Sequence, residues 1–171
     1  GAGGMGEVYE AEQENPRRSV AVKVIRPGAA SRETMSRFRR EAQLLGALHH
    51  PGIAAIYEAG VGEVVMASGV ARSQPYFVME YVRGEALSEY VARVKPTVSE
   101  RLELFARICD AADHAHRAGI VHRDLKPANV LIEVNDGVAA PKVLDFGVAR
   151  AEQGGSNTLR TDAMQLVGTV P

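Results

Sequence analysis

The sequence predicts an α+β fold in two lobes: an antiparallel sheet with one helix in residues 1–83, and a mainly helical part in residues 84–171. Three observations support this prediction. Valine-rich runs with a period of two, typical of strands, occur in the first part. Apolar residues at helical spacing follow a capping sequence in the second part. Gly84 stands where the composition changes, so we place the lobe boundary there.

The composition is that of a globular domain. The chain has 171 residues, of which 46% are hydrophobic and 24% charged, enough for a substantial core. The net charge of −1 gives no reason to expect nucleic acid as a partner. The single cysteine, Cys109, excludes an internal disulfide and fits a reducing compartment. Since no apolar run reaches the ~18 residues that span a bilayer, we expect a cytoplasmic domain.

The first eight residues are rich in glycine and fit the pattern G-x-G-x-x-G-x-V. Glycines let backbone amides approach phosphate oxygens, which makes Gly1, Gly3 and Gly6 candidate phosphate-binding residues. The same spacing opens a helix in dinucleotide-binding folds. Here residues 7–11 alternate polar and apolar side chains, which favours a strand and therefore a hairpin. An ordinary Gly-rich turn is the alternative for this segment alone.

The segment Ser19–Ile25 is rich in valine and predicts another strand. A period of two places Lys23 on the same face as Ala21 and Ile25. If that face is buried, the ammonium group needs a partner. The common alternative is a lysine at the sheet edge that points to solvent.

Residues 31–49 predict an amphipathic helix, and Glu41 falls within its apolar stripe by angle. The stripe consists of Phe38, Leu45 and Leu48. A carboxylate on a buried stripe needs a cation, and Lys23 is the natural candidate. A partly exposed glutamate at the margin of the stripe is the alternative.

The next segments predict the rest of the sheet. We expect strands over 53–59 and 63–67, a polar loop over 68–75, and a strand over 75–82 that runs into a connector at about 80–83. A short helix is predicted over Leu87–Val94.

A long helix is predicted from the capping box Thr97-Val98-Ser99-Glu100 to about His116, with Gly119 as its stop. We assign its buried face to Leu102, Phe105, Cys109 and Ala112. Cys109 is thus interpreted as a core residue.

The run from His122 to Asn129 places an acid, a cation and an amide within a few positions. Asp124 can accept a proton from an attacking hydroxyl, Lys126 can neutralise a moving phosphoryl group, and Asn129 can reach a divalent metal. Pro127 disfavours helix at Lys126, so the run should be a loop.

A predicted hairpin over residues 130–144 joins this loop to Asp145-Phe146-Gly147. Gly147 allows a sharp change of backbone direction, which leaves Asp145 able to hold a metal bound to nucleotide phosphates. A plain turn after a strand is the alternative. The position of Asp145 so soon after Asn129 favours the functional interpretation.

These motifs, in this order, resemble the catalytic domain of eukaryotic-type protein kinases. Leu-Lys-Pro at 125–127 is similar to the serine/threonine branch, and Gly-Gly-Met-Gly-Glu-Val-Tyr near the start resembles bacterial, PknB-like members. The resemblance implies a bilobal kinase fold and transfer of the ATP γ-phosphoryl group to serine or threonine hydroxyls of proteins. It implies Mg²⁺, or Mn²⁺ instead, as the metal. A nucleotide-binding pseudokinase or scaffold module and a small-molecule phosphotransferase are the alternatives.

The resemblance also implies roles for individual residues. Lys23, paired with Glu41, orients the phosphates; Asp124 is the base; Asn129 and Asp145 bind the metal. The implied adenine site consists of Val8 and Ala21 above the ring, Leu131 beneath it, Met79 as gatekeeper, and backbone groups of Glu80 to Val82.

Residues 148–171 resemble an activation segment, with Ser156, Thr158 and Thr161 as candidates for phosphorylation. We favour Thr161, with Arg123 binding the added phosphate and a homodimer performing the autophosphorylation. Both ends of the chain resemble cuts through a larger domain. We therefore expect this fragment itself to be inactive and a membrane anchor, where there is one, to lie beyond residue 171.

Overall fold

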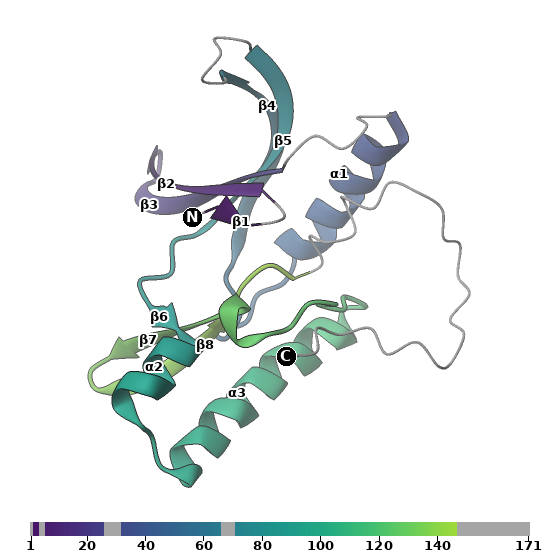
Figure 1. Cartoon of the computed structure of the whole chain (residues 1–171). Coiled ribbons are helices and arrows are strands. Elements are labelled where there is room, and N and C mark those ends of the chain that lie inside the picture. The colour runs from purple at the N-terminus through teal and green to yellow at the C-terminus, as the bar shows by residue number, and fades with distance from the viewer. Residues whose placement is uncertain (1, 4–5, 26–31, 66–70, 147–171) are drawn as a thin grey trace.

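The computed structural model describes residues 2–3, 6–25, 32–65 and 71–146, which form two bodies joined by a connector, residues 81–84 (Figure 1). The first body is a sheet with one helix. The second body contains the other helices and a small sheet. This arrangement agrees with the predicted α+β class.

The sheet of the first body has the strand order β1-β2-β3-β5-β4, and every neighbouring pair is antiparallel. Its strands are β1 (Ala2–Gly3), β2 (Gly6–Glu14), β3 (Arg17–Ile25), β4 (Ile56–Val65) and β5 (Ala71–Glu80). The Gly-rich start therefore forms a β1–β2 hairpin, as predicted, and not the opening of a helix.

The central strand β3 buries the face that carries its lysine. Ala21 and Ile25 are buried, and Lys23 is only 3% exposed. Because Val8 on β2 and Phe77 on β5 flank Lys23 in the register, this lysine lies in the interior of the sheet. The alternative of an edge lysine pointing to solvent is therefore wrong.

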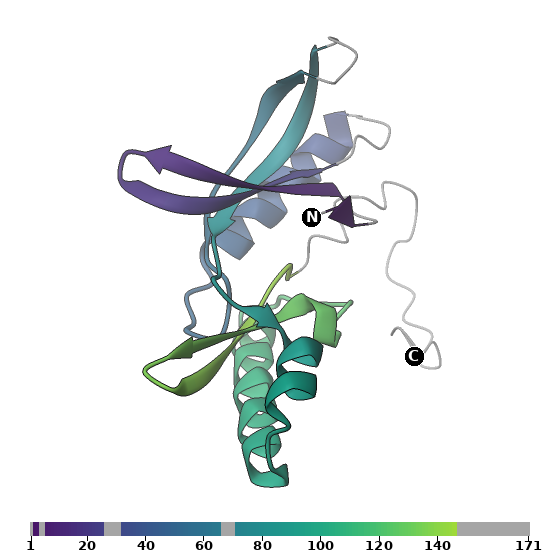
Figure 2. The same cartoon turned by 60° about the vertical axis from the view of Figure 1, so that its left-hand side comes forward.

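Helix α1 (Arg32–Gly46) packs against β4 on one side of the sheet (Figures 1 and 2). Phe38 and Leu45 of the predicted stripe are confirmed as buried residues of α1. Leu48 is also buried but follows the helix, which ends at Gly46 and not near residue 49 as predicted. The rings of Phe38 and Phe77 lie 4.9 Å apart, which fixes the helix over β5.

The boundaries of β4 and β5 differ from the prediction. One strand, β4, covers most of the two strands expected there, and β5 already begins at Ala71, inside the expected polar loop. The polar residues Ser73 and Gln74 pair with Glu63 and Gly62 of β4. Backbone pairing with a neighbouring strand therefore outweighs the weak strand propensity of these polar side chains.

The segment between α1 and β4, which we call the α1–β4 linker (residues 47–55), reaches into the second body. Ala54 N–H donates to Val143 O over 3.0 Å, and Val143 N–H donates to Gly52 O over 2.8 Å. Ile53 and Val143 form a parallel bridge. The two bodies are thus joined by backbone hydrogen bonds as well as by the connector.

The second body has helices on a three-stranded sheet of order β6-β7-β8. Its elements are β6 (Glu85–Ala86), α2 (Leu87–Val94), α3 (Val98–Arg117), the 3₁₀ helix η1 (Pro127–Asn129), β7 (Val130–Asn135) and β8 (Val138–Val143). The capping box of Thr97 and Glu100 is present at the start of α3. None of the described helices is both long and apolar enough to cross a membrane.

The buried face of α3 is not the predicted one. Its buried residues are Leu104, Ile108, Ala111 and Ala115. Leu102 and Phe105 are more than 60% exposed, and Cys109 is also exposed, so Cys109 is not a core residue. Apolar residues line two adjacent faces of this helix, and periodicity alone cannot tell which face meets β8.

Candidate functional site

The loop before η1 is held in place by a buried histidine. His122 is 4% exposed, and its Nδ1 accepts a hydrogen bond from the Asp124 N–H over 3.3 Å. Its Nε2 therefore carries the proton and donates to Leu144 O over 2.8 Å. The His122 ring also lies 4.8 Å from that of Phe146. One side chain thus ties the loop to the segment that follows β8.

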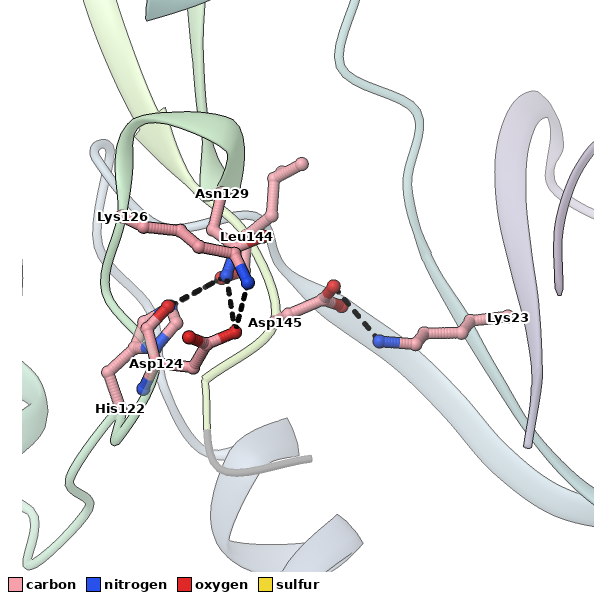
Figure 3. A network of polar contacts seen from close by, with 7 residues as sticks. All are labelled: Lys23, His122, Asp124, Lys126, Asn129, Leu144 and Asp145. Carbon is pink, nitrogen blue, oxygen red and sulfur yellow. Dashed lines mark hydrogen bonds and ion pairs between the residues drawn. The ribbon is translucent and has the colours of Figure 1, made fainter. Parts of the chain in front are cut away.

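Within this loop, three of the predicted residues are in contact around the Asp124 carboxylate (Figure 3). Lys126 Nζ lies 2.7 Å from Asp124 Oδ2. Asn129 Nδ2 donates to Asp124 O over 2.8 Å and lies 3.4 Å from Oδ2. Lys126 has an extended backbone, φ −149° and ψ 162°, as expected for a residue before proline. The carboxylate, the cation and the amide therefore share one small region.

Two residues around the site have left-handed backbones. Arg123 has φ 68° and Asp145 has φ 59°, a conformation that costs energy for residues other than glycine. The backbone just before Asp145 is anchored, since Leu144 N–H donates to Asn129 O over 2.9 Å. The change of backbone direction that was expected at Gly147 already begins at Asp145. Gly147 itself lies outside the described residues.

An ion pair joins the two bodies across the site (Figure 3). Lys23 Nζ, from β3, lies 2.9 Å from Asp145 Oδ2, and the two side chains are 4% and 26% exposed. Glu41 was the predicted partner of Lys23. Glu41 lies within α1, but its side chain is outside the described part of the structure, so that pair stays a prediction.

Asn129 and Asp145 offer oxygen ligands that suit a hard cation. They come from adjacent segments, because the Leu144–Asn129 hydrogen bond pairs the two backbones. Among the described residues there is no cluster of three or more His, Cys, Asp or Glu able to hold a metal. Mg²⁺ binds oxygen ligands, and in nucleotide sites one or two protein side chains share it with waters and substrate phosphates. The residues present therefore fit a magnesium ion bound together with a nucleotide.

The predicted adenine residues lie on both bodies. Ala21 and Met79 are buried cross-strand neighbours on β3 and β5. Val8 is 38% exposed on β2, and Leu131 is half-buried on β7. Val82 is buried in the connector. In the Gly-rich hairpin, Gly3 and Gly6 face each other in register, and Gly1 lies outside the described residues.

Glu80 uses its side chain as well as its backbone. Its N–H donates to Ala55 O over 2.8 Å, and its Oε2 accepts from the Ala55 N–H over 3.1 Å. Its Oε1 lies 2.6 Å from Lys142 Nζ on β8. From the sequence, Glu80 was expected to act only through its backbone, and Lys142 was not predicted to take part in the site. The available signal was that a period of two places Lys142 on the same face as the apolar residues Ala140 and Leu144, as it places Lys23 beside Ala21 and Ile25.

An open cavity of about 610 Å³ lies beside the connector. It is lined by residues 81–85 together with Glu10, Arg93, Ile132 and Val134. A hydrogen bond to Glu10 raises the pKa of Tyr81. A hydrogen bond from Arg93 lowers the pKa of Glu85, and Arg93 Nε lies 3.1 Å from Glu85 Oε2. The acidic groups of this cavity thus already have partners within the chain.

Ser156, Thr158 and Thr161 lie outside the described residues. Arg123, the predicted phosphate ligand, is exposed beside Asp124.

Comparison with known proteins agrees with the motifs. Residues 1–171 match the family described as "Protein kinase domain". The chain is 44% identical to a probable serine/threonine-protein kinase of Streptomyces coelicolor, over 99% of this chain and 24% of that protein. It is 42% identical to the serine/threonine-protein kinase PknB of Mycobacterium tuberculosis, over 99% of this chain and 26% of that protein. The chain thus spans about a quarter of the length of these curated relatives.

Proposed function

The chain belongs to the protein kinase family, and on this premise we propose that it transfers the γ-phosphoryl group of ATP to serine or threonine hydroxyls of proteins. The printed names of the relatives support the choice of serine and threonine. Lys126, two positions after Asp124, supports the same choice. Kinases of this family generally use ATP together with Mg²⁺.

The observation that most directly supports the proposal is the 2.7 Å contact between Lys126 and Asp124. Asp124 orients the substrate hydroxyl and accepts its proton as the oxygen attacks the γ-phosphorus. The bond from the γ-phosphorus to the β–γ bridging oxygen breaks, and ADP leaves. Lys126, held beside the carboxylate, stabilises the negative charge on the transferred group. Asp124 and Lys126 would thus act by positioning the reacting groups and by stabilising charge.

The remaining site residues orient the nucleotide. Lys23, which belongs to the first body, binds the α- and β-phosphates. Asn129 and Asp145 would hold Mg²⁺, which neutralises phosphate charge when it is bound. The Lys23 ammonium and the Asp145 carboxylate lie 2.9 Å apart between the two bodies. When the nucleotide binds, Lys23 can therefore contact phosphate oxygens and remain close to Asp145.

The proposal is tested with the full-length protein, labelled ATP and four acceptors: serine, threonine and tyrosine peptides, and an aminoglycoside. We expect transfer to the serine or threonine peptides, and its loss on addition of EDTA. Asp124→Asn should lower the rate by roughly 10² to 10⁴-fold, the usual contribution of a general base. Asp113→Asn on the exposed face of α3 is the matched control and should leave the rate unchanged.

The other functions predict different results in the same assay. Nucleotide binding without transfer to any acceptor would indicate a pseudokinase or scaffold module. Transfer to the aminoglycoside alone would indicate a small-molecule phosphotransferase. Either result contradicts the proposed function.

We also propose that the protein phosphorylates Thr161 between two copies of itself. The exposed position of Arg123, directly before Asp124, supports this, because a phosphate can form charge-assisted hydrogen bonds with its guanidinium group. Mixing active protein with the Asp124→Asn variant should label Thr161 of the variant, as measured by mass spectrometry. Labelling of the active copy alone would exclude transfer between copies.

A further inference from the structure

The side chain of Glu80 joins three segments that are far apart in the sequence. It belongs to the last residue of β5, accepts a hydrogen bond from Ala55 of the α1–β4 linker, and forms an ion pair with Lys142 of β8. We propose that Glu80 and Lys142 are a positioning pair for the nucleotide site, which holds the strand leading to Asp145 against the first body. This inference rests on the proposed function, since it concerns nucleotide binding at that site.

The pair is shielded from solvent, unlike most ion pairs of the described residues. The side chains of Lys142 and Glu80 are 14% and 24% exposed. In contrast, the side chains of the Arg117–Asp113 pair on α3 are 80% and 54% exposed. Exposed pairs contribute little because water and salt screen them, whereas a shielded pair holds its geometry more strongly. The Glu80–Lys142 pair can therefore constrain the backbone on both of its sides.

The constraint at Lys142 passes to Asp145 through a short and well-bonded segment. Val143 is fully buried, and both of its backbone groups bind the α1–β4 linker. Leu144 donates to Asn129 O and accepts from His122 Nε2. A displacement of β8 at Lys142 would therefore move Asp145 as well, because the intervening residues have little freedom to absorb it.

Two ion pairs thus connect the bodies on either side of Val143 and Leu144. One is Glu80–Lys142, at the connector, and the other is Lys23–Asp145, at the phosphates. Loss of the first pair should broaden the range of distances that Asp145 samples relative to Lys23. Nucleotide affinity should fall for that reason, even though neither Lys142 nor the Glu80 carboxylate is assigned a contact with the nucleotide.

The experiment compares variants of the full-length protein. Lys142→Met keeps the apolar stem and removes the charge, and Glu80→Gln keeps an acceptor for the Ala55 N–H. Each should raise the Kd for MgATP and the KM for ATP by about three- to tenfold, with kcat changed by less than about twofold, because the groups that stabilise the transition state remain. The double variant should bind MgATP no more weakly than the weaker of the two single variants, since all three variants lose the same interaction.

Three further measurements separate positioning from plain stability. Lys142→Arg keeps a cation at this position, and its Kd should stay within about twofold of the wild-type value. Arg117→Met removes an exposed pair elsewhere and should leave Kd unchanged. Hydrogen exchange at the amides of Val143 and Leu144 should become faster in Lys142→Met, while exchange in α3 stays the same.

A Lys142→Met variant with a lowered Tm but an unchanged Kd would overturn the inference and leave the pair a purely structural contact. So would additive effects of the two single variants on Kd. The Kd measurement needs no phosphoryl transfer. A wild-type protein that binds MgATP without transferring phosphate would therefore contradict the proposed function and still decide this inference.

Discussion

The ammonium nitrogen of Lys23 lies 2.9 Å from a carboxylate oxygen of Asp145, although β3 and the segment after β8 belong to different bodies. The two partners differ in burial: the lysine side chain is 4% exposed and the carboxylate 26%. A buried charge without a partner is much more costly than a partly hydrated one. The pair is therefore asymmetric, and so are the consequences of breaking it.

Substitution of either partner tests this asymmetry. Asp145→Asn leaves the Lys23 ammonium buried without this carboxylate, and should lower the free energy of unfolding by about 1–3 kcal/mol. Lys23→Met replaces the buried charge by an apolar chain, and should change it by less than about 1 kcal/mol. Urea unfolding of both variants measures the difference. A greater loss of stability in Lys23→Met would contradict the assigned burial.

Gly84 allows a close approach of two backbones at the connector. A Cβ at this position would lie 2.6 Å from the carbonyl oxygen of Ile132, too close for any real contact. Gly84→Ala should therefore destabilise the protein by about 1–3 kcal/mol, because a backbone atom must move. Gly46→Ala is the matched control, since a Cβ there meets nothing within 4 Å. It should be neutral, or stabilise α1 by up to about 1 kcal/mol. Equal effects of the two variants in thermal unfolding would refute this account.

Two leucines of α3 test which face of the helix is buried. Leu104 is 6% exposed and Leu102 is 61% exposed. In the chain of residues 1–171, Leu104→Ala should cost about 2–5 kcal/mol through lost burial and a cavity. Leu102→Ala should stay within about 0.5 kcal/mol, as for other surface substitutions. Denaturant titration provides both numbers, and comparable losses would show that the Leu102 face is covered too.

The capping box at the start of α3 makes the stability of this helix depend on pH. Hydrogen bonds from the side chain and the backbone N–H of Thr97 lower the pKa of Glu100 below 4.5. A lowered pKa in the folded state adds stability above the ordinary pKa, which is lost as the pH falls through the lowered value. The stability difference between wild type and Glu100→Gln should therefore shrink below about pH 4.5. A difference that stays constant from pH 7 to pH 3 would exclude a charged cap.

The cap has a second test at neutral pH. Thr97→Ala removes the oxygen that accepts from the Glu100 N–H, and should cost about 1 kcal/mol, as for other N-cap threonines. Circular dichroism during urea unfolding measures it. A cost near zero would indicate that water replaces the cap without loss.

Local patterns predicted the elements whose structure depends on neighbours in the sequence. The Gly-rich hairpin, the α1 stripe of Phe38 and Leu45, and the Thr97 cap all follow from spacing within a few residues. The loop that carries Asp124 follows from Pro127 in the same way. The roles assigned to these side chains in phosphoryl transfer stay predictions, to be decided by the assays above.

Choices between equivalent alternatives needed the folded chain. The sequence alone specifies a strand-rich part, a helix-rich part and the chemical groups of the candidate site, because side-chain alternation, capping and proline geometry act over a few residues. Tertiary packing selected the Leu104 face of α3 over the Leu102 face, and it brought Lys142 to Glu80. Contacts between distant segments depend on which surfaces are covered together, and hydrophobic periodicity contains no information about the partner that covers them.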